Sequence, residues 1–431
     1  MENNTLAKNI ATMQLESGSK DEWKKKAALF ISSQGLSLFG SMLVQYAIIW
    51  HVTLTTQSGG ILTISTLAAF LPQIIISLFA GVWADRYPRK RLIIFADVLT
   101  AVSTLILAVF FLLGYQELWL IFLISAIRSV GAGIQMPAVN AFLPQIVPMD
   151  RLVKVNSING TIQPFIMIAA PLVSGALLSI SRLEDIFFID VFTAILAVSL
   201  LLVLKVPAHQ KAAAEQTTGY LDDLKAGLIY IKYNRVIKTL FIFFAFVFFL
   251  VAPVAFLSPL LVTRSFGDEV WRLTANEVTF FVGSIIGGIL MTAWGGFKNH
   301  FRTIGLACII WAVLFAALGL SNVFLLYLVF MFLAGIPMPM FNVPTTTLLQ
   351  EMVDPDMQGR VFSVMQLIIS TIMPAGMLVF GPIADFISIE ALLVLCSTLM
   401  AIPALWIFFN RQPIKTGAGL PSADYEIQTG D

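Results

Sequence analysis

The feature that most constrains this chain is the recurrence of apolar stretches of about 20 residues, the length a helix needs to cross the hydrocarbon core of a bilayer. Twelve stretches meet this condition, and breaks such as 57–60 and 86–89 separate them with turn residues or charges. The predicted spans are residues 28–52, 60–83, 92–114, 117–138, 158–180, 185–205, 236–262, 276–296, 303–320, 323–346, 362–384 and 388–409. The sequence therefore predicts an all-α polytopic membrane protein.

Composition agrees with this prediction and excludes other classes. Hydrophobic residues make up 58% of the 431 residues and charged residues 12%, whereas a soluble domain has roughly 25% charged residues. The net charge of +1 offers no basic surface for nucleic acid. Cys308 and Cys396 both lie in apolar stretches, so no disulfide framework is implied. A cytosolic enzyme, a nucleic-acid-binding protein and a disordered protein are thereby excluded.

The distribution of Lys and Arg predicts the orientation, because cytoplasmic loops carry an excess of both. With the N-terminus inside, 22 of the 26 basic residues fall in cytoplasmic segments. External loops hold Arg182, Arg264 and Arg272, while Arg128 lies within a span. We therefore expect both termini on the cytoplasmic side of the plasma membrane. The apolar run that follows the leading segment lacks a signal-cleavage site, so that segment is predicted to stay on the protein as a tail.

A polar stretch divides the chain into two blocks of six spans. Within it, Leu221, Leu224, Leu228 and Ile231 recur at helical spacing opposite charged residues, which predicts an amphipathic helix on the cytoplasmic membrane surface. The predicted organisation is an N-terminal tail (1–27), a six-helix bundle (28–205), a linker (206–235), a second six-helix bundle (236–410) and a C-terminal tail (411–431).

The two blocks resemble copies of one another. Residues 133–140 and 335–342 share five identities in eight at an offset of 202, and Gly175 matches Gly381 in a further matching stretch at offset 206. Parallel six-span repeats place a substrate site between the halves near the bilayer midplane, with rocking of the halves giving alternating access. The sequence thus predicts two pseudo-symmetric bundles around a shared site.

The loop after the second span, residues 81–91, matches the pattern G-x-x-x-D-R-x-G-R-[KR], with Pro88 where glycine is usual. In this position the motif resembles that of the major facilitator superfamily, and the resemblance extends over nearly the whole chain. It implies the fold of that family and a latch that holds the halves together in one conformation. The latch residues are Gly81, Asp85, Arg86, Arg89 and Lys90. The competing interpretation is a purely basic anchor.

Further stretches, at 33–38, 95–97, 127–131, 189–191 and 358–363, resemble the macrolide-efflux branch of drug exporters, which is related to siderophore exporters of the enterobactin type. The resemblance implies export of amphiphilic molecules driven by proton exchange. Residues 170–175 resemble the G-P-x-x-G-G exporter motif and retain Pro171 and Gly175. A general kinked contact between small residues is the alternative.

Ionisable residues inside the spans are the candidates for proton coupling. Arg128 lies about 12 residues into its span, where a charge is expensive unless it faces a cavity or a carboxylate. Asp190 and Asp97 are the nearest candidates, each expected to be wetted from its own side, and either is predicted to carry the proton while Arg128 biases its charge. The alternatives are a structural charge pair for Arg128 and an ion pair of Asp97 with the basic residues 89–91.

Uncharged polar side chains recur at helical spacing in several spans, and two carboxylates lie at span ends. In an otherwise apolar and aromatic cavity, such uncharged groups suit a bulky amphiphile, although interhelical hydrogen bonding is an equal alternative. The predicted cavity residues are Gln34, Ser41, Gln45, Gln135, Asn159, Gln163, Asn342 and Gln366. Glu277 and Asp385 are predicted to be solvated caps or gate contacts at external span ends.

The sequence as a whole predicts a secondary transporter that exports hydrophobic or amphiphilic molecules by proton antiport. We expect a small amphiphilic substrate, protons and membrane lipid as partners, no nucleic acid, and action as a monomer. No Walker loop is present and the three histidines lack metal-ligand spacing, so no enzyme activity, cofactor or metal is expected. The alternatives are a dedicated exporter of a siderophore, a lipid-like or a bile-acid-like metabolite, and a membrane receptor or scaffold that transports nothing.

Overall fold

The structure is a computed structural model that describes the backbone of residues 2–204 and 220–409. Within these ranges the side chains of residues 2–21, 82, 85 and 220–223 are outside the described set. Regular structure in the described part is entirely helical, and twelve helical segments are long and apolar enough to cross a membrane. The predicted fold class and the number of spans are confirmed. The predicted C-terminal tail, 411–431, lies outside the described residues.

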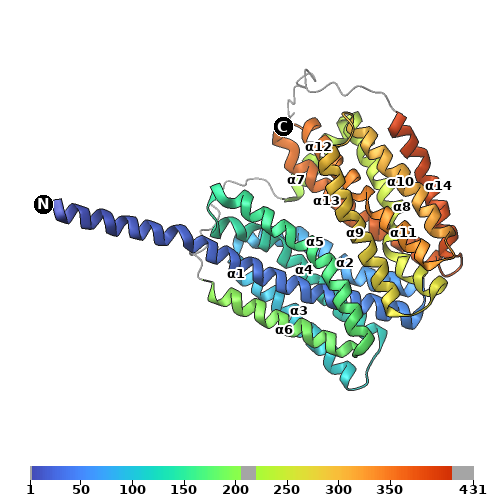
Figure 1. The fold of residues 1–431 in the computed structure, drawn as a ribbon, viewed down its shortest axis with the longest axis horizontal. Coiled ribbons are helices and arrows are strands. Elements are labelled where there is room, and N and C mark those ends of the chain that lie inside the picture. The colour runs from blue at the N-terminus through green and yellow to red at the C-terminus, as the bar shows by residue number, and fades with distance from the viewer. Residues whose placement is uncertain (1, 205–219, 410–431) are drawn as a thin grey trace, which may run out of the picture.

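Two bundles of six spans make up the molecule (Figure 1). The first contains α1 (Glu2–Thr56), α2 (Gly59–Arg86), α3 (Arg89–Leu112), α4 (Leu118–Ile146), α5 (Leu152–Ile180) and α6 (Leu183–Val203), with a single 3-10 turn at Met149–Arg151. The second contains α8 (Arg235–Phe266), α9 (Val270–Trp294), α10 (His300–Leu320), α11 (Phe324–Gly335), α12 (Pro337–Met352), α13 (Pro355–Ile383) and α14 (Ile389–Phe409). Span ten is divided between α11 and α12 just before Pro337, which lacks the N–H that would continue the hydrogen-bond ladder.

The eighth span begins at Val270, six residues before the predicted start, and this moves Glu277 well inside the helix. The predicted start is wrong because it leaves the charged Arg272 in an external loop. In the structure the Arg272 guanidinium donates to the carbonyl of Phe266 and pairs with Glu269 at 2.7 Å, so its charge is neutralised at the helix start.

The N-terminal bundle has two apolar cores separated by a layer of polar side chains. One core contains Phe30, Ile93 and Phe142, and the other contains Phe111 and Phe187. Helices α1, α3, α4 and α6 each run from one core, through the polar layer, into the other. We define the polar layer as Gln34, Ser37, Asp97, Thr104, Arg128, Gln135 and Asp190. The buried apolar residues of the C-terminal bundle instead form one continuous cluster.

The bundles touch each other at two helix crossings that the internal repeat relates. Where α5 crosses α9, a Cβ on Gly175 would collide with the Thr274 side chain. Where α13 crosses α2, a Cβ on Gly381 would collide with Thr63. Glycine is needed at both sites because only it allows the backbones to approach this closely. The two glycines matched in the sequence repeat thus occupy equivalent contacts.

A second matched pair of glycines packs inside the bundles. A Cβ on Gly133 of α4 would meet the backbone of Gln73 on α2. A Cβ on Gly335 of α11 would meet the backbone of Phe280 on α9. Since α2 and α9 are the second spans of their respective halves, the repeat in sequence is also a repeat of helix packing.

The described part of the linker is a single helix, α7 (Tyr220–Tyr233). It packs on α13, where a Cβ on Gly227 would meet the Arg360 carbonyl, and Ile231 is buried in the C-terminal core. Leu228 on the same helix is exposed. A helix is present at the predicted place and lies against the C-terminal bundle, while its predicted position on the membrane surface stays a prediction. Residues 205–219 of the linker lie outside the described residues.

The bundles meet at one end and diverge toward the other (Figure 1). At the closed end, the loop between α1 and α2 contacts the loop between α13 and α14. At the opposite end, which carries the start of α1 and α7, Gly81 of α2, Gly160 of α5 and Gly359 of α13 border open space: a Cβ there meets nothing within 4 Å. The two glycine crossings between the bundles therefore lie in the half of these helices nearer the closed end.

Candidate functional site

An ion pair between Arg128 of α4 and Asp190 of α6 lies within the polar layer. Nη1 of Arg128 is 2.5 Å from Oδ2 of Asp190, and the side chains are 8% and 2% exposed. Thr104 of α3 accepts a hydrogen bond from Arg128 and donates one to the same carboxylate oxygen at 2.9 Å. Nη2 of Arg128 donates to the Ser41 carbonyl of α1 at 3.3 Å. The pair therefore joins four of the six helices of this bundle.

Such burial is tolerated only because each charge has a partner. A buried charge costs several kcal/mol unless it is paired and hydrogen bonded. The approach of α1 contributes to the burial, because a Cβ on Gly40 would collide with Thr193 and lie close to the Asp190 carboxylate. The expectation that water reaches Asp190 from its own side is wrong, because the side chain is sealed between α1, α3, α4 and α6.

Asp97 forms the second polar cluster of the layer and has a different environment. Its Oδ1 accepts hydrogen bonds from Ser37 at 2.6 Å and from Gln135 at 2.7 Å, while its Oδ2 is buried without a partner. The side chain is 2% exposed, so Asp97 too is shielded, contrary to the expectation from the sequence. Among the described residues, no cation lies within ion-pair distance of it. Asp97 is thus a buried carboxylate with no counter-charge.

The predicted ion pair of Asp97 with residues 89–91 is wrong. Arg89 and Lys90 donate hydrogen bonds to backbone carbonyls instead. Arg89 donates to Ala141 at 2.8 Å, and Lys90 donates to Leu204 at 2.8 Å. Arg91 is exposed. The basic residues therefore tie the start of α3 to the ends of α4 and α6.

The predicted latch does not bridge the bundles through these contacts. Arg89 and Lys90 bind within the N-terminal bundle, Arg86 is exposed, and Gly81 borders open space. The Asp85 side chain lies outside the described residues. The role of the motif as a latch stays a prediction.

The predicted cavity residues do not converge on one point. Gln34 and Gln135 come together at 3.4 Å beside Asp97, which is the interhelical hydrogen bonding considered as the alternative. Ser41 contributes its backbone carbonyl, which accepts a hydrogen bond from Arg128. Gln45 and Asn159 are half-buried, whereas Gln163, Asn342 and Gln366 are exposed, and their role as cavity residues stays a prediction.

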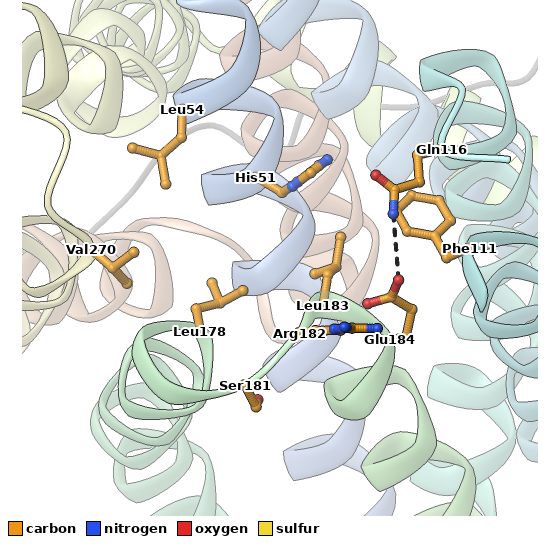
Figure 2. A pocket seen from close by; sticks show the side chains of 10 residues that line it. All are labelled: His51, Leu54, Phe111, Gln116, Leu178, Ser181, Arg182, Leu183, Glu184 and Val270. Carbon is orange, nitrogen blue, oxygen red and sulfur yellow. Dashed lines mark hydrogen bonds between the residues drawn. The ribbon is translucent and has the colours of Figure 1, made fainter. Parts of the chain in front are cut away.

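Two surface cavities lie elsewhere and contain none of the predicted cavity residues. One, of about 460 Å³, lies at the closed end between α1, the α5–α6 loop and the start of α9, and Figure 2 shows His51 and Glu184 on its wall. Gln116 donates to Glu184 there at 3.4 Å. The other, of about 440 Å³, follows the α5–α9 crossing and includes Gly175 of the exporter-like motif. Pro171, one turn earlier, is buried in α5.

A cluster of charges and helix ends joins the bundles at the closed end. Asp385 accepts hydrogen bonds from the backbone N–H groups of Gly59 and Gly60, at 2.7 and 2.9 Å, and from the Ser58 hydroxyl at 2.8 Å. Arg264 pairs with Asp385 at 3.0 Å and donates to the Gln57 carbonyl. We call these contacts, made by Gln57, Ser58, Gly59, Gly60, Arg264 and Asp385, the clasp. Asp385 thus makes contacts between the bundles, and its predicted role as a gate stays a prediction.

The clasp uses the polarity of helix ends as well as an ion pair. Asp385 lies at the N-terminus of α2, where unpaired N–H groups favour an anion, and Arg264 lies against the carbonyls that end α1 and α13. Partial burial acts to raise the pKa of Asp385, but its hydrogen bonds from Gly60, Gly59, Ser58 and Arg264 hold the pKa below its ordinary value. The carboxylate is therefore ionised at neutral pH, and the clasp is closed.

Sequence reasoning missed a polar network in the C-terminal bundle. Asn276 of α9 is fully buried, accepts from the Tyr327 hydroxyl of α11 at 2.9 Å and donates to Ser258 of α8 at 3.3 Å. Its amide also donates to Glu277 at 3.4 Å. Glu277 is half-buried inside the span, so the prediction of a solvated cap is wrong. Because the predicted span begins at residue 276, the sequence places Asn276 and Glu277 at a span end, whereas the start at Val270 places both inside the helix.

Comparison with known proteins is consistent with this architecture. The sequence profile described as Major Facilitator Superfamily matches residues 27–373 and again 270–423. Macrolide efflux protein A of Streptococcus pyogenes is 28% identical over 88% of this chain and 94% of its own length, and its namesake from Enterococcus faecalis is 27% identical over 72% and 97%. The crystal structure of the nucleoside transporter NupG has a similar fold, with a TM-score of 0.66 at 14% identity over 91% of this chain and all of that one.

The fold and the similar proteins together identify the kind of protein that this chain is. The chain is a multi-pass membrane transporter and not an enzyme. It belongs to the Major Facilitator Superfamily.

The ion pair makes a testable prediction about stability. Arg128→Met leaves Asp190 buried without a counter-charge, and we expect it to destabilise the protein by about 3–5 kcal/mol. The double substitution Arg128→Met with Asp190→Leu removes both charges and should cost clearly less. Thermal unfolding of the purified variants in detergent measures both. Equal or greater loss in the double variant would contradict the pairing.

Proposed function

We propose that this protein exports amphiphilic small molecules across the plasma membrane by proton antiport, with both termini in the cytoplasm. Its similarity to two proteins named macrolide efflux protein A supports export of this class of molecule. The observation that carries the proposal of proton coupling is Asp97, a carboxylate buried in the polar layer without a counter-charge.

Asp97 is the proton carrier in this proposal, and Asp190 is not. Asp190 pairs with Arg128 and accepts a hydrogen bond from Thr104, and releasing it would leave a guanidinium unpaired in the same layer. Asp97 has one oxygen with two donors and one oxygen with none, which is the arrangement of a carboxyl group that binds and releases a proton. The cost of burying its charge falls when the proton binds.

Proton binding at Asp97 affects other helices of the bundle through the side chains that donate hydrogen bonds to its carboxylate. Ser37 belongs to α1 and Gln135 to α4, so the hydrogen bonds of one carboxylate of α3 connect three helices. Gln34, whose Nε2 is buried without a partner, lies beside Gln135. Loss of negative charge at Asp97 weakens its bonds to Ser37 and Gln135, because hydrogen bonds to an ionised acceptor are the stronger ones. In this way the proton alters the relative positions of α1, α3 and α4.

The two ends of the molecule support alternating access as part of the proposal. The clasp and the glycine crossings at Gly175 and Gly381 hold the bundles together at the closed end. The predicted latch residues lie at the opposite end, where Gly81 borders open space. We assign this conformation to an inward-facing state, in which the clasp is closed and the latch is released. Rocking of the bundles about the two glycine crossings would open the clasp and close the latch.

The proton carrier gives a prediction for transport. In proteoliposomes, Asp97→Asn should reduce macrolide transport driven by a proton gradient at least tenfold, while exchange of labelled for unlabelled substrate without a gradient persists. The reason is that the amide keeps the shape of the side chain and accepts hydrogen bonds but cannot cycle a proton.

The matched control is Asp150→Asn, which alters an exposed carboxylate on the same bundle. Both activities should survive in this control. Gradient-driven transport by Asp97→Asn at the wild-type rate would show that another group carries the proton.

The clasp gives a prediction for conformation. Asp385→Asn removes the charge that Arg264 and the α2 N-terminus bind, and charge-assisted hydrogen bonds contribute about 1.5–3 kcal/mol each. We expect a shift of about tenfold or more toward states that are open at the clasp. Spin labels at Tyr115 and Asn322, placed on closed-end loops of opposite bundles, should report a longer distance.

Lowering the pH from neutral to about 5 should leave the clasp of the wild type closed. Because its pKa is lowered, Asp385 stabilises the clasp above the ordinary carboxylate range, and this stabilisation is lost as the pH falls through the lowered pKa. Between neutral pH and about pH 5 the label distance should therefore hold steady, and it should lengthen only in stronger acid. A distance that does not change in Asp385→Asn would exclude the clasp as the contact that closes this end.

A further inference from the structure

We propose that the cavity at the closed end binds a neutral, hydroxylated amphiphile, and that the bound molecule holds this end closed. The cavity is the one of about 460 Å³ between α1, the α5–α6 loop and the start of α9 (Figure 2). The binding site is argued from the cavity itself, whereas its external location and its effect on transport rest on the proposed function.

Both bundles contribute to the wall of this cavity. Val270, the first residue of α9, belongs to the C-terminal bundle, and the other lining residues belong to the N-terminal bundle. Leu178 of α5 lines the cavity and also packs against the C-terminal core. Separation of the bundles at this end would move Val270 away from Leu178 and divide the wall. A ligand that contacts both bundles here therefore binds the closed arrangement more tightly than the open one.

The cavity has an apolar side and a polar side. In Figure 2, Leu54, Leu178 and Val270 lie on one side, and Gln116 and Glu184 lie on the other. Sites for small molecules typically measure about 300–1,000 Å³ and combine apolar walls with a few polar groups that orient the ligand. The volume and the division of the walls suit a molecule with an apolar tail and a polar head group.

The polar side presents an acceptor that the protein itself uses little. Glu184 is 5% exposed, and among the described residues its one hydrogen bond comes from Gln116 at 3.4 Å. Hydrogen bonds to an ionised group are typically about 2.7–2.9 Å, so this bond is long. The imidazole of His51 lines the same cavity and has no hydrogen bond within the part of the chain that the structure describes. A carboxylate, an amide and an imidazole can together accept from and donate to the hydroxyl groups of one ligand.

The charges on the wall favour a neutral head group. Arg182 lines the cavity together with Glu184, so the two formal charges cancel. An ionic ligand of either sign would meet a like charge on this wall, and such juxtapositions are costly. Adjacent hydroxyl groups, as in a glycoside, supply donors for the carboxylate without bringing a charge of their own.

Binding in this cavity opposes the opening of the closed end. A ligand that binds one arrangement alone stabilises it by mass action, about tenfold when its concentration is roughly ten times its dissociation constant. Because rocking of the bundles divides the cavity, the ligand must leave before this end can open. An exported molecule of this class would thus slow further export as it accumulates outside.

The first test uses three probes that share one alkyl chain: hexyl glucoside, hexylammonium and hexyl sulfate. Binding to the wild type in lipid nanodiscs is measured by calorimetry, with empty nanodiscs as the blank. We expect both ions to bind at least about tenfold more weakly than the glucoside. Binding of either ion as tight as that of the glucoside would overturn the proposed ligand class.

Variants on opposite sides of the cavity test its location. Glu184→Gln removes the acceptor, and Val270→Phe fills the apolar side without changing a polar group. Each should weaken binding of the glucoside about tenfold. The matched control is Glu117→Gln, an exposed carboxylate beside Gln116, which should bind as the wild type does. Thermal unfolding identifies a variant that fails to fold, and wild-type affinity in either folded variant would overturn the site.

Spin labels at Asp150 and Asp356 test the effect on conformation. Both residues are exposed at the opposite end of the molecule, one on each bundle, so the labels do not touch the cavity. The glucoside should shift the wild-type population toward the longer label distance, and macrolide transport in proteoliposomes should slow. An unchanged distribution at saturating glucoside would overturn the holding role.

The outcomes separate this inference from the proposed function. If the glucoside binds in a manner that requires Glu184 and Val270 but the wild type transports no macrolide, the export proposal fails and the site stands. If transport is proton-driven and the glucoside neither binds nor slows it, the export proposal stands and the site fails.

Discussion

The pairing of Arg128 with Asp190 is the interaction on which the N-terminal bundle depends. Four helices present polar groups at the same depth, and a charge at that depth is stable only with a partner. Once Asp190 is committed to Arg128, the remaining carboxylate of the layer, Asp97, has hydroxyl and amide donors but no cation among the described residues. The layer thus contains one charge pair and, among the described residues, one carboxylate without a counter-charge, to which the proposed function assigns the proton.

The repeat makes the two halves similar in packing and leaves them different in chemistry. Gly175 and Gly381 make equivalent contacts between the bundles, and Gly133 and Gly335 make equivalent contacts within them. The polar layer, however, belongs to the N-terminal bundle, whereas the described C-terminal bundle has a continuous apolar core with a small network around Asn276. The contacts between the bundles are therefore symmetric, whereas the buried polar groups of the two halves differ.

Span number, fold class and repeat follow from apolar length and spacing, so the sequence alone predicts them. Partner choice inside the membrane does not follow, because it depends on which helix faces are opposed in three dimensions. Spacing could not show that Asp97 bonds to Ser37 and Gln135 while Lys90 turns to the carbonyl of Leu204. Glu277 was misplaced because the charge of Arg272 is neutralised by local contacts that hydropathy cannot register.

The most direct measurement of the central claim is infrared spectroscopy of the carboxyl groups in purified protein as the pH is lowered from neutral to mildly acidic values. A protonated carboxyl group has a C=O stretch distinct from that of a carboxylate, and it shifts on exchange into D₂O. Our account predicts such a band in the wild type, with a component that is absent in Asp97→Asn and retained in Glu277→Gln. A wild-type spectrum without the band, or a band left intact by Asp97→Asn, would contradict it.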